Sequence, residues 1–457
     1  MAKRRIKDIM RLWKICRRNA IFCVRIAGQQ YFAGKTRFMN LLARKILRAY
    51  EIFMENINIL GVKISNLDKE KLLVRAKDFL ADDKQHFIVT PNPEILLAAA
   101  KDEELSYILN QADLALGDGI GLKIAGWFSG RNLKRVTGAD FSAELLNLSV
   151  RENIKVGILL WKNGLSKKLD VEAALRAKYP QLNFFVSAIS READAKIGEE
   201  FLNFAPQIIL VGLGFPYQEK FIYHNLKNIS SGKIFIGVGG SLDFITGKRR
   251  RAPKIFRQIG MEWLWRFLFS PQIDVGQKRS ARIWNAICVF PLEFAKQKFI
   301  QPFFYRRNVV CLLYKKTGDK FKILLVERQH EPGHWQLPQG GTDSEKLLIA
   351  GARELREEIN TDKFIGKRVF KNVYRYTFPN VSQIAHLRRK HANYKGQSQG
   401  LFIAEFTGRD EDIKINYWDH SAWKWVDSEK LVDEVHLIRK RAAQRFLKKF
   451  KEFVKQK

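Results

Sequence analysis

Short apolar runs recur between residues 57 and 247, and glycine or polar residues follow each run. Helical stretches separate the runs, which are residues 87–90, 114–116, 156–160, 208–211 and 234–238. A short, wholly apolar run bounded by turn residues is typical of a strand buried on both faces. Repeated strand and helix units imply a mostly parallel sheet with helices on both faces. The pattern therefore predicts an α/β fold with a Rossmann-like domain.

Polar residues directly follow the first two of these runs. The first run ends at Thr90 and turns through residues 91–94, and the second leads into Gly-Asp-Gly at residues 117–119. In open α/β sheets ligands bind beyond the carboxyl ends of strands, so polar side chains of both turns are candidates for one pocket. These candidates are Thr90, Asn92, Glu94 and Asp118. The alternative is that the prolines only end a strand and that Asp118 caps a helix.

The two turns belong to a longer, ordered set of motifs. The set comprises residues 86–121, 135–140, 211–220, 237–244, 251–253 and 260–264. In order and spacing it resembles the WecG/TagA/CpsF family of glycosyltransferases, over about residues 57–285. Several separate motifs in one order are far more specific than any single loop.

This resemblance implies transfer of an N-acetylmannosamine-type sugar from a UDP-sugar donor to a lipid-pyrophosphate-linked N-acetylglucosamine acceptor, a step of cell-surface polysaccharide synthesis. It makes Asp118 the base that takes the proton of the acceptor hydroxyl, a task that suits a carboxylate. It also implies substrate contacts from Thr90 and Asn92. Contacts to the donor or its diphosphate are expected from Arg135 and Gln218.

Three features bear on the cofactor and the donor. No Asp-x-Asp metal motif occurs in this region, so we expect transfer without a metal or other cofactor. The loop at residues 212–216 lacks the third glycine of the dinucleotide fingerprint, which argues against a nicotinamide site. After Leu160 the family has a glycine-containing turn, whereas this chain has Trp161-Lys162-Asn163-Gly164, which points to a difference in donor specificity.

A second pattern begins near residue 308. Residues 308–315 and 322–327 predict strands, and a helix is expected from about 344 to 359. On a helical wheel its apolar residues share one face, whereas three acids gather elsewhere: Glu354, Glu357 and Glu358. Like charges so placed repel, and a hard cation such as Mg²⁺ would relieve the repulsion. The alternative is a solvated acidic face.

The sequence Arg353-Glu354-Leu355-Arg356-Glu357-Glu358, with Glu345 eight residues before Arg353, resembles the Nudix box. Residues 335–341 and 394–399 resemble the branch that hydrolyses dinucleoside polyphosphates or RNA 5′ ends. The resemblance implies an α/β/α Nudix domain that hydrolyses a nucleoside-diphosphate-linked substrate. It also implies that the three glutamates bind Mg²⁺ and that Arg353 and Glu345 brace the loop against the helix. We take Glu357 as the candidate catalytic residue, and which glutamate acts as the general base stays open.

Two positions depart from the Nudix box. The spacing from Gly340 to Glu345 is one residue shorter than usual, and Asn360 stands where the box has glycine. Both differences affect the loop and the helix end more than the carboxylates. Because Asn tolerates the left-handed conformation that glycine supplies, we expect the helix end to be preserved.

The charge of the chain indicates a polyanionic partner. The formal net charge is +34, and residues 1–56 hold 14 Lys or Arg against 3 acids, interleaved with apolar residues. Basic amphipathic helices of this kind suit an anionic membrane surface. Residues 248–251 and the aromatic cluster at 263–269 suggest the same contact. A solvated tail and, less favoured, nucleic acid are the alternatives.

Other features constrain the compartment. The four cysteines form no Cys-x-x-Cys pair, which argues for a reducing compartment and against a zinc site. No apolar run reaches the roughly 18 residues of a membrane span. We therefore expect a cytoplasmic chain that is peripheral on the inner face of the cell membrane.

The sequence thus predicts a bifunctional enzyme in four parts. These are a basic amphipathic segment (1–56), a WecG/TagA/CpsF-like domain (57–276), a basic aromatic connector (277–306) and a Nudix domain (307–457), whose last helix is expected at about 431–454. The competing hypothesis makes the chain mainly an RNA 5′-end or dinucleoside polyphosphate pyrophosphohydrolase, with a non-catalytic, membrane-binding first domain.

Overall fold

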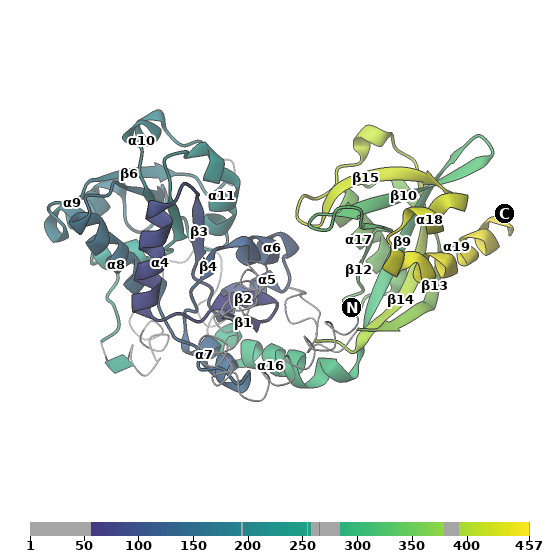
Figure 1. The fold of residues 1–457 in the computed structure, drawn as a ribbon, viewed down its shortest axis with the longest axis horizontal. Coiled ribbons are helices and arrows are strands. Elements are labelled where there is room, and N and C mark those ends of the chain that lie inside the picture. Colours follow the sequence, from purple (N-terminus) through teal and green to yellow (C-terminus); the bar gives the residue numbers. More distant parts are fainter. Residues whose placement is uncertain are drawn as a thin grey trace, which may run out of the picture. The chain divides into compact units, whose positions relative to one another are not determined.

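The computed structural model describes residues 56–192, 195–253, 255–256, 265, 284–378 and 393–456. The basic segment predicted to contact a membrane, except its last residue, lies outside the described residues. The same is true of the aromatic cluster at residues 263–269, except Trp265. The described residues after the basic segment form two α/β domains (Figure 1).

The first domain is built on a six-stranded sheet in the order β4-β3-β8-β7-β5-β6. Every neighbouring pair in it is parallel. Its strands are β3 (His86–Val89), β4 (Leu114–Ala115), β5 (Val156–Trp161), β6 (Phe184–Ile189), β7 (Ile208–Gly212) and β8 (Ile234–Gly237). The five apolar runs match five of these strands. Strand β6 was not predicted, because this edge strand is only partly buried and Ser187 interrupts its apolar residues.

Helices cover both faces of this sheet, as the β-α pattern predicts. Alternate strand residues point to opposite faces, so Phe87 and Val89 enter one core while Ile88 enters the other. The first core includes residues of α5 (Pro93–Ala99), α6 (Glu103–Gln111), α7 (Ile120–Phe128), α10 (Glu199–Phe204) and α11 (Tyr217–Asn225). The second includes residues of α4 (Lys69–Ala81), α8 (Gly138–Arg151), α9 (Lys168–Lys178) and α12 (Ser241–Ile245).

Two further elements complete the first domain. A hairpin of β1 (Asn56–Ile59) and β2 (Val62–Ser65) turns through Leu60 and Gly61, whose φ angles of 50° and 86° suit a tight hairpin turn. The described part of the expected connector is helical as far as Phe303, and strand β9 (Tyr305–Thr317) of the second domain begins within it. The helical part contains α16 (Phe290–Ala295), with π-helical segments at Asn285–Val289 and Lys296–Ile300 and a 3-10 turn at Gln301–Phe303.

The second domain contains a mixed sheet of seven strands. They are β9 (Tyr305–Thr317), β10 (Lys320–Arg328), β11 (Trp335–Gln336), β12 (Gln339–Gly341), β13 (Phe364–Thr377), β14 (Gly396–Phe406) and β15 (His420–Asp427). One face packs on α17 (Leu347–Ile359), through residues such as Val309 and Cys311. The other packs on α18 (Leu431–Glu434) and α19 (Lys440–Val454). The order of helix, sheet and helix agrees with the predicted α/β/α domain.

Two predicted helix boundaries in this domain were wrong. The helix expected from residue 344 begins at Leu347, because Asp343 and Ser344 have φ angles of 43° and 70° that a helix cannot include. The helix expected at 431–454 is two helices separated at His436, whose N–H donates to the carbonyl of Trp335 (2.9 Å).

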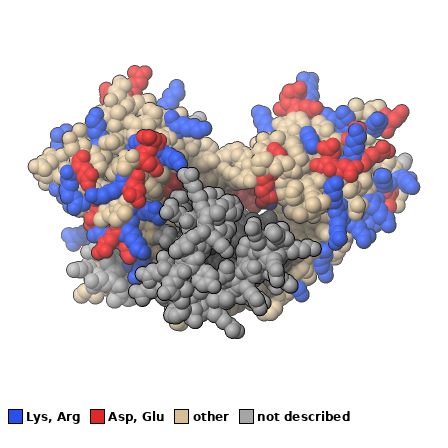
Figure 2. All heavy atoms as spheres, in the orientation of Figure 1, with Lys and Arg blue, Asp and Glu red and all other residues tan. Residues whose placement is uncertain are grey.

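Charged side chains of both signs lie together on the face shown in Figure 2. Among the cations of residues 248–251, Lys248 pairs with Asp170, and Arg249 with Asp243 at 3.4 Å. Part of the positive charge that was predicted to contact a membrane is therefore paired with acids of the first domain. In the described part of the chain, no helix is long and apolar enough to cross a membrane.

Candidate functional site

Hydrogen bonds join the loops that follow β3, β4 and β8. The N–H of Asp118 donates to the carbonyl of Pro91 (2.9 Å), which ties the second loop to the first. The Thr90 hydroxyl donates to the carbonyl of Gly237 (3.2 Å), which ties the first loop to the carboxyl end of β8, where the third loop begins. Thr90 and Asp118 are thus brought to the carboxyl edge of the sheet, where the sequence placed them.

The helix-capping alternative applies to Asn92 rather than to Asp118. The Asn92 side-chain oxygen accepts the N–H of Ile95 (2.9 Å) and caps α5. The N-cap residue of α7 is Gly119, which has no side chain to cap the helix. Its φ of 107° provides the sharp turn immediately after Asp118. Asp118 is therefore not the N-cap residue of α7, whereas Asn92 is the N-cap residue of α5.

The motif at residues 135–140 packs against the same loops. Thr137 caps α8, and its hydroxyl donates to the carboxylate of Asp140 (2.6 Å). Arg251 donates to the other Asp140 oxygen (2.6 Å). A Cβ on Gly138 would come within 2.9 Å of the Thr90 methyl group, so only glycine fits there. Arg135, two residues before Thr137, is half-buried beside this network.

Gln218, which the resemblance linked to the donor, is 3% exposed and bonded within the protein. Its Oε1 accepts the N–H of Gly239 (2.9 Å), and its Nε2 donates to Glu219 (2.9 Å). The side chain therefore joins the start of α11 to the loop after β8. A Cβ on Gly237 would meet Gln218 at 2.6 Å, which explains the glycine there.

A cation and two aromatic rings form a cluster that the sequence did not predict. The guanidinium of Arg191 lies 3.5 Å from the ring centroid of Trp161 and 5.0 Å from that of Tyr217. Its Nε donates to the carbonyl of Leu213 (2.6 Å). Arg191 follows β6, Trp161 ends β5 and Tyr217 follows β7. All three therefore lie at the carboxyl edge of the sheet. Trp161 was noted only as a departure from the family pattern.

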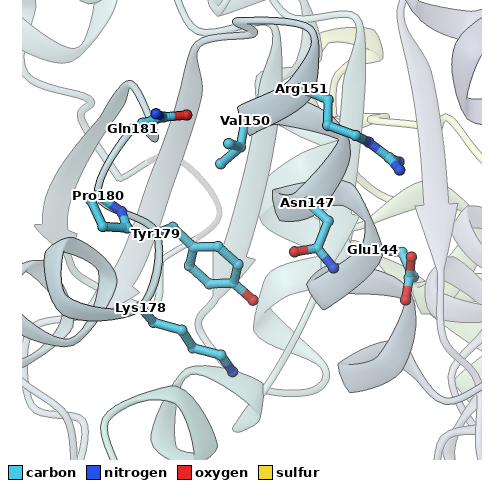
Figure 3. A pocket seen from close by; sticks show the side chains of 8 residues that line it. All are labelled: Glu144, Asn147, Val150, Arg151, Lys178, Tyr179, Pro180 and Gln181. Carbon is cyan, nitrogen blue, oxygen red and sulfur yellow. The ribbon is translucent and has the colours of Figure 1, made fainter.

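A hollow of the first domain lies at the opposite edge (Figure 3). It is lined by Glu144, Asn147, Val150, Arg151, Lys178, Tyr179, Pro180 and Gln181. These residues end α8 or connect α9 to β6, at the amino ends of the strands. Burial and the charge of Glu144 raise the pKa of Tyr179. The hollow is therefore separate from the Asp118 loops, and we assign it no part in the reaction.

In the second domain, Arg353 joins the predicted loop and helix. Its Nε donates to Glu345 (2.9 Å), and its Nη2 donates to the carbonyl of Gly341 (2.9 Å). Its Nη1 contacts Glu354 at 2.9 Å and Glu357 at 3.0 Å. The geometry expected for Arg353 and Glu345 is present. The loop that is one residue short closes through the two left-handed residues before Glu345.

Two of the three predicted metal ligands are buried. Glu354 and Glu358 are each 7% exposed, and Glu357 is exposed. Burial and the neighbouring Glu358 raise the pKa of Glu354 to about 8, although Arg353 opposes the shift. Carboxylates held close together in a buried place repel one another, and the positive charge around them is too small to neutralise them. A hard divalent cation would supply that charge.

The three glutamates are not arranged as a complete set of metal ligands. Among the described residues, no three Asp, Glu, His or Cys side chains are arranged to hold a metal ion. Arg353 draws Glu354 and Glu357 toward itself, while Glu358 accepts the N–H of Gln339 (3.0 Å). Mg²⁺ tolerates a partial donor set, because it keeps several waters and takes ligands from substrate phosphate.

His420, at the start of β15, faces the end of α17 and was not predicted. Its Nε2 lies 3.2 Å from Glu358, and the side chain is 3% exposed. Burial opposes the charged form of His420, but Glu358 outweighs it and raises the His420 pKa. No sequence signal marks His420, because it lies 62 residues after Glu358.

Polar side chains occupy the part of the sheet face that α19 does not cover. We call them the polar floor; they are Arg306, Gln339, Tyr376, Gln397 and Gln399. Gln399, 1% exposed, donates to Gln339 (2.9 Å), and Tyr376 donates to Gln397 (2.8 Å). Arg306 pairs with Gln397 across β9 and β14, and its guanidinium lies so near Gly341 that a Cβ there would come within 2.4 Å. Burial lowers the pKa of Arg306. The floor therefore presents amide, phenol and guanidinium groups beside the carboxylates.

Comparison with known proteins concerns the two domains separately. The model of the glycosyl transferase WecG/TagA/CpsF family matches residues 57–301. The chain belongs to this family. The model of the NUDIX domain matches residues 304–450. The chain is therefore an enzyme with a glycosyltransferase domain and a Nudix hydrolase domain.

Relatives of the transferase domain have a described reaction. The N-acetylglucosaminyldiphosphoundecaprenol N-acetyl-beta-D-mannosaminyltransferase of Staphylococcus aureus (strain MRSA252) is 32% identical over 247 residues, which cover 53% of this chain and 93% of that relative. The protein of that name from S. aureus strain COL has the same identity and coverage.

Solved structures similar to this chain include Nudix proteins. An Ap4A hydrolase binary complex of C. elegans has a TM-score of 0.26 and 21% identity, over 33% of this chain and 99% of its own. The NUDIX domain of Shewanella oneidensis NrtR, complexed with ADP ribose, has a TM-score of 0.25 and 15% identity, over 35% and 97%.

Proposed function

We propose that the first domain transfers an N-acetylmannosamine-type sugar from a UDP donor to N-acetylglucosamine linked through diphosphate to a lipid, in cell-surface polysaccharide synthesis. The observation that carries the proposal is the joining of the loops after β3, β4 and β8, with Thr90 and Asp118 at one sheet edge. The name of the S. aureus relative supports the choice of sugar and acceptor.

The proposed step is a single displacement. The acceptor hydroxyl oxygen bonds to the anomeric carbon while its proton passes to the Asp118 carboxylate, and UDP leaves with the electrons of the broken bond. Thr90 and Asn92 orient the acceptor beside Asp118, and Arg135 is a candidate for contact with the donor diphosphate. The internal hydrogen bonds of Gln218 make it a positioning residue for the loop after β8 rather than a direct donor contact.

The Trp161, Arg191 and Tyr217 cluster supports a place for the donor nucleotide. Its three side chains lie at the carboxyl edge of the same sheet. Aromatic faces suit the uracil ring, and a guanidinium suits the diphosphate.

Because the proposed acceptor is linked to a lipid, we also propose that the enzyme acts at the inner face of the cell membrane, as a peripheral protein.

For the second domain we propose Mg²⁺-dependent hydrolysis of a nucleoside-diphosphate-linked substrate. Glu354, Glu357 and Glu358 would hold the metal, which supplies polarisation of the phosphoanhydride when bound. Arg353 keeps the glutamates and the loop in place. The amides and tyrosine of the polar floor offer partners for a nucleobase, and Arg306 offers one for phosphate.

A second candidate function gives this domain the main role, as a hydrolase of RNA 5′ ends or dinucleoside polyphosphates beside a non-catalytic first domain. The amide and phenol groups gathered in the polar floor are the observation that favours it, because such groups suit a nucleobase. The loops joined around Asp118 favour the bifunctional proposal instead, because a scaffold does not need them.

Phosphorus NMR of the full chain tests both proposals in one sample. The sample contains UDP-N-acetylmannosamine, a lipid-linked N-acetylglucosamine acceptor and Mg²⁺. UDP that forms only when acceptor is present supports the transferase. UMP that forms without acceptor means that the Nudix domain cleaves the nucleotide sugar, and the proposed donor must then be withdrawn.

A further inference from the structure

Exposed cations gather on two elements of the second domain, β13 and α19. Strand β13 contains four Lys or Arg and no acid, whereas α19 contains six Lys or Arg and one acid. Figure 2 shows Lys and Arg on the side of this domain where Figure 1 places α19. The exposed members of this group are Arg368, Lys371, Arg441, Arg445, Lys448 and Lys451, and we call them the basic surface.

The two elements lie against each other. The ammonium group of Lys449 on α19 lies 5.5 Å from the ring centroid of Phe370 on β13. Arg368 of β13 donates to the side chain of Gln456, which lies two residues after α19. The basic surface therefore extends across both elements.

Little of this charge is neutralised within the domain. The one acid of α19, Glu452, is paired with Lys449 at 2.7 Å, outside the basic surface. In the part of the chain that the structure describes, no acid forms an ion pair with Arg441, Arg445 or Lys451. One sign of charge concentrated in this way attracts polyanions.

The apolar side of α19 is not available to such a partner. Phe446, Phe450 and Phe453 are buried in the core of the domain, so the side of α19 that faces solvent is polar. A helix that lies on a bilayer needs an exposed apolar side. The basic surface therefore suits a polyanion in water rather than a lipid bilayer.

Three aromatic rings lie in a row at the end of β13. The rings of Tyr374 and Tyr376 are stacked with centroids 5.9 Å apart, and the ring of Phe378 lies 5.6 Å from that of Tyr376. All three side chains are half-buried, and we call them the aromatic row. The row leads from the strand that carries part of the basic surface to the polar floor, because Tyr376 belongs to both the row and the floor.

We propose that the basic surface and the aromatic row bind single-stranded RNA. Cations along a surface neutralise the phosphates of a strand, and aromatic rings stack on its unpaired bases. From Arg441 to Lys451, α19 spans about 15 Å, which matches about four phosphates at a spacing of roughly 3.4 Å. A strand on this surface has one end at the polar floor, beside the proposed metal site.

Single-stranded RNA fits this surface better than other nucleic acids. The bases of a duplex are stacked on one another, so a duplex cannot use the aromatic row. RNA presents unpaired bases in its loops and ends, where proteins reach them, whereas cellular DNA is paired. Binding to this surface goes beyond the proposed hydrolysis and does not depend on it.

The test is the binding of a fluorescent single-stranded RNA of about twelve nucleotides to the full chain, followed by anisotropy over a series of salt concentrations. The strand has a 5′-hydroxyl, so it offers no phosphoanhydride to cleave. The basic-surface variant, Arg441→Gln/Arg445→Gln/Lys448→Gln, removes three of the exposed cations of α19. Circular dichroism checks that each variant is folded.

The matched control also removes three exposed cations of the second domain. It is Lys363→Gln/Arg409→Gln/Lys414→Gln, beside Phe364 and Ile413, which pack on the α17 side of the sheet. The control has the same net charge as the basic-surface variant. It therefore separates a local contact from the general attraction of a basic protein for RNA.

We expect the basic-surface variant to bind the RNA roughly tenfold or more weakly, because it loses three phosphate contacts. The slope of the logarithm of the binding constant against the logarithm of the salt concentration should decrease in magnitude by about two for the same reason. The control variant should bind like the wild type. Equal binding by the wild type and the basic-surface variant would overturn the proposal.

The variant Phe378→Ser tests the stacking separately. It should bind single-stranded RNA about fivefold or more weakly with an unchanged salt slope, because it loses a stacked ring but no charge. Unchanged binding by this variant, or tighter binding of single-stranded DNA than of RNA by the wild type, would contradict the assignment to single-stranded RNA. Loss of binding to phosphatidylglycerol vesicles in the basic-surface variant, with RNA binding unchanged, would make the partner a membrane instead.

A second readout concerns the polar floor and rests on the proposed hydrolysis. With Mg²⁺ present, the same RNA should raise the KM of the wild type for a dinucleoside polyphosphate without lowering kcat, and should raise it less in the basic-surface variant. An unchanged KM would refute the placement of the strand end at the floor. If the wild type hydrolyses no nucleotide, the proposed function of the second domain fails, while the anisotropy measurements still decide the RNA surface.

Discussion

At the scale of single residues, Asp118 lies at the carboxyl edge of the sheet, where we propose that it acts as the base. Its N–H donates to the carbonyl of Pro91, and it is not the N-cap residue of α7. We predict that Asp118→Asn lowers kcat for transfer by about 10²- to 10⁴-fold, since an amide cannot accept the proton. The melting temperature should not change. Asp83→Asn, on an exposed turn, is the control, and unchanged transfer by Asp118→Asn would exclude Asp118 from the mechanism.

Glu219 is a buried acid whose protonation should affect stability. It is 1% exposed, and burial raises its pKa from 4.5 to about 7. The folded protein thus holds this proton more tightly than the unfolded chain. The stability contributed by the protonated group is fully present below about pH 4.5 and is lost as the pH rises to about 7. The loss amounts to roughly 3 kcal/mol.

We predict that Glu219→Gln removes this pH dependence, because an amide does not titrate. The difference in unfolding free energy between wild type and variant should change by roughly 3 kcal/mol between about pH 4.5 and pH 8. Urea denaturation at both pH values measures it. Glu199→Gln, an exposed substitution on α10, serves as control, and parallel curves for wild type and Glu219→Gln would contradict the prediction.

Residue positions were predictable where a side chain lies next to a strand end. Thr90 and Asp118 directly follow runs that form β3 and β4, and the rule for parallel sheets places such residues at one edge. The function of Gln218 was not predictable in this way. Its partner Gly239 lies 21 residues away and meets it only through the order of β7 and β8 in the sheet. His420 was missed for the same reason.

At the scale of elements, the end of α17 depends on Asn360. As expected from the sequence, Asn360 is left-handed, with φ 49°. Its side chain also donates to the carbonyl of Lys414 (2.7 Å). We predict that Asn360→Ala lowers stability by about 2 kcal/mol, from the left-handed strain and the lost hydrogen bond. Asn360→Gly should cost less, since glycine adopts this conformation freely.

Thermal unfolding of the second domain, followed with and without Mg²⁺, measures both substitutions. Asn372 provides a control, because it is also left-handed, with φ 50°, but lies on β13 away from α17. Asn372→Ala should lower stability without altering the Mg²⁺ response. An Asn360→Ala variant as stable as Asn360→Gly would mean that the conformation of this helix end carries no strain.

Element types were predicted better than element boundaries. Apolar periodicity identified α17 and the buried strands, because burial fixes which residues must be apolar. Periodicity could not reveal that Asp343 and Ser344 are left-handed. It also could not reveal that the last helix is interrupted at His436, whose N–H donates to the carbonyl of Trp335. Both features arise from contacts with distant parts of the domain. Strand β6 was missed because it lies at the sheet edge, where Ser187 interrupts its apolar residues.

At the scale of the whole chain, the described hydrophobic cores belong to one domain or the other. The two cores of the first domain draw on residues 57–294, and those of the second on residues 309–453. A domain with its own cores can unfold as its own unit. We therefore expect Mg²⁺ with a non-hydrolysable nucleotide to raise only one of two calorimetric transitions, since a ligand stabilises the unit that binds it. A single transition that shifts as a whole would contradict separate folding units.

Separate cores also predict separate activities. Glu357→Gln should lower Mg²⁺-dependent hydrolysis by about 10²-fold or more, because it removes one of the three carboxylates that we propose to hold the metal. Transfer should be unchanged in this variant, as hydrolysis should be in Asp118→Asn. Glu411→Gln, an exposed change in the second domain, is the control for hydrolysis. Phosphorus NMR reports both reactions in one tube, because UDP and UMP give distinct signals. Loss of both reactions in either variant would mean that the two sites are coupled. The activity of each domain would then depend on the other domain despite their separate cores.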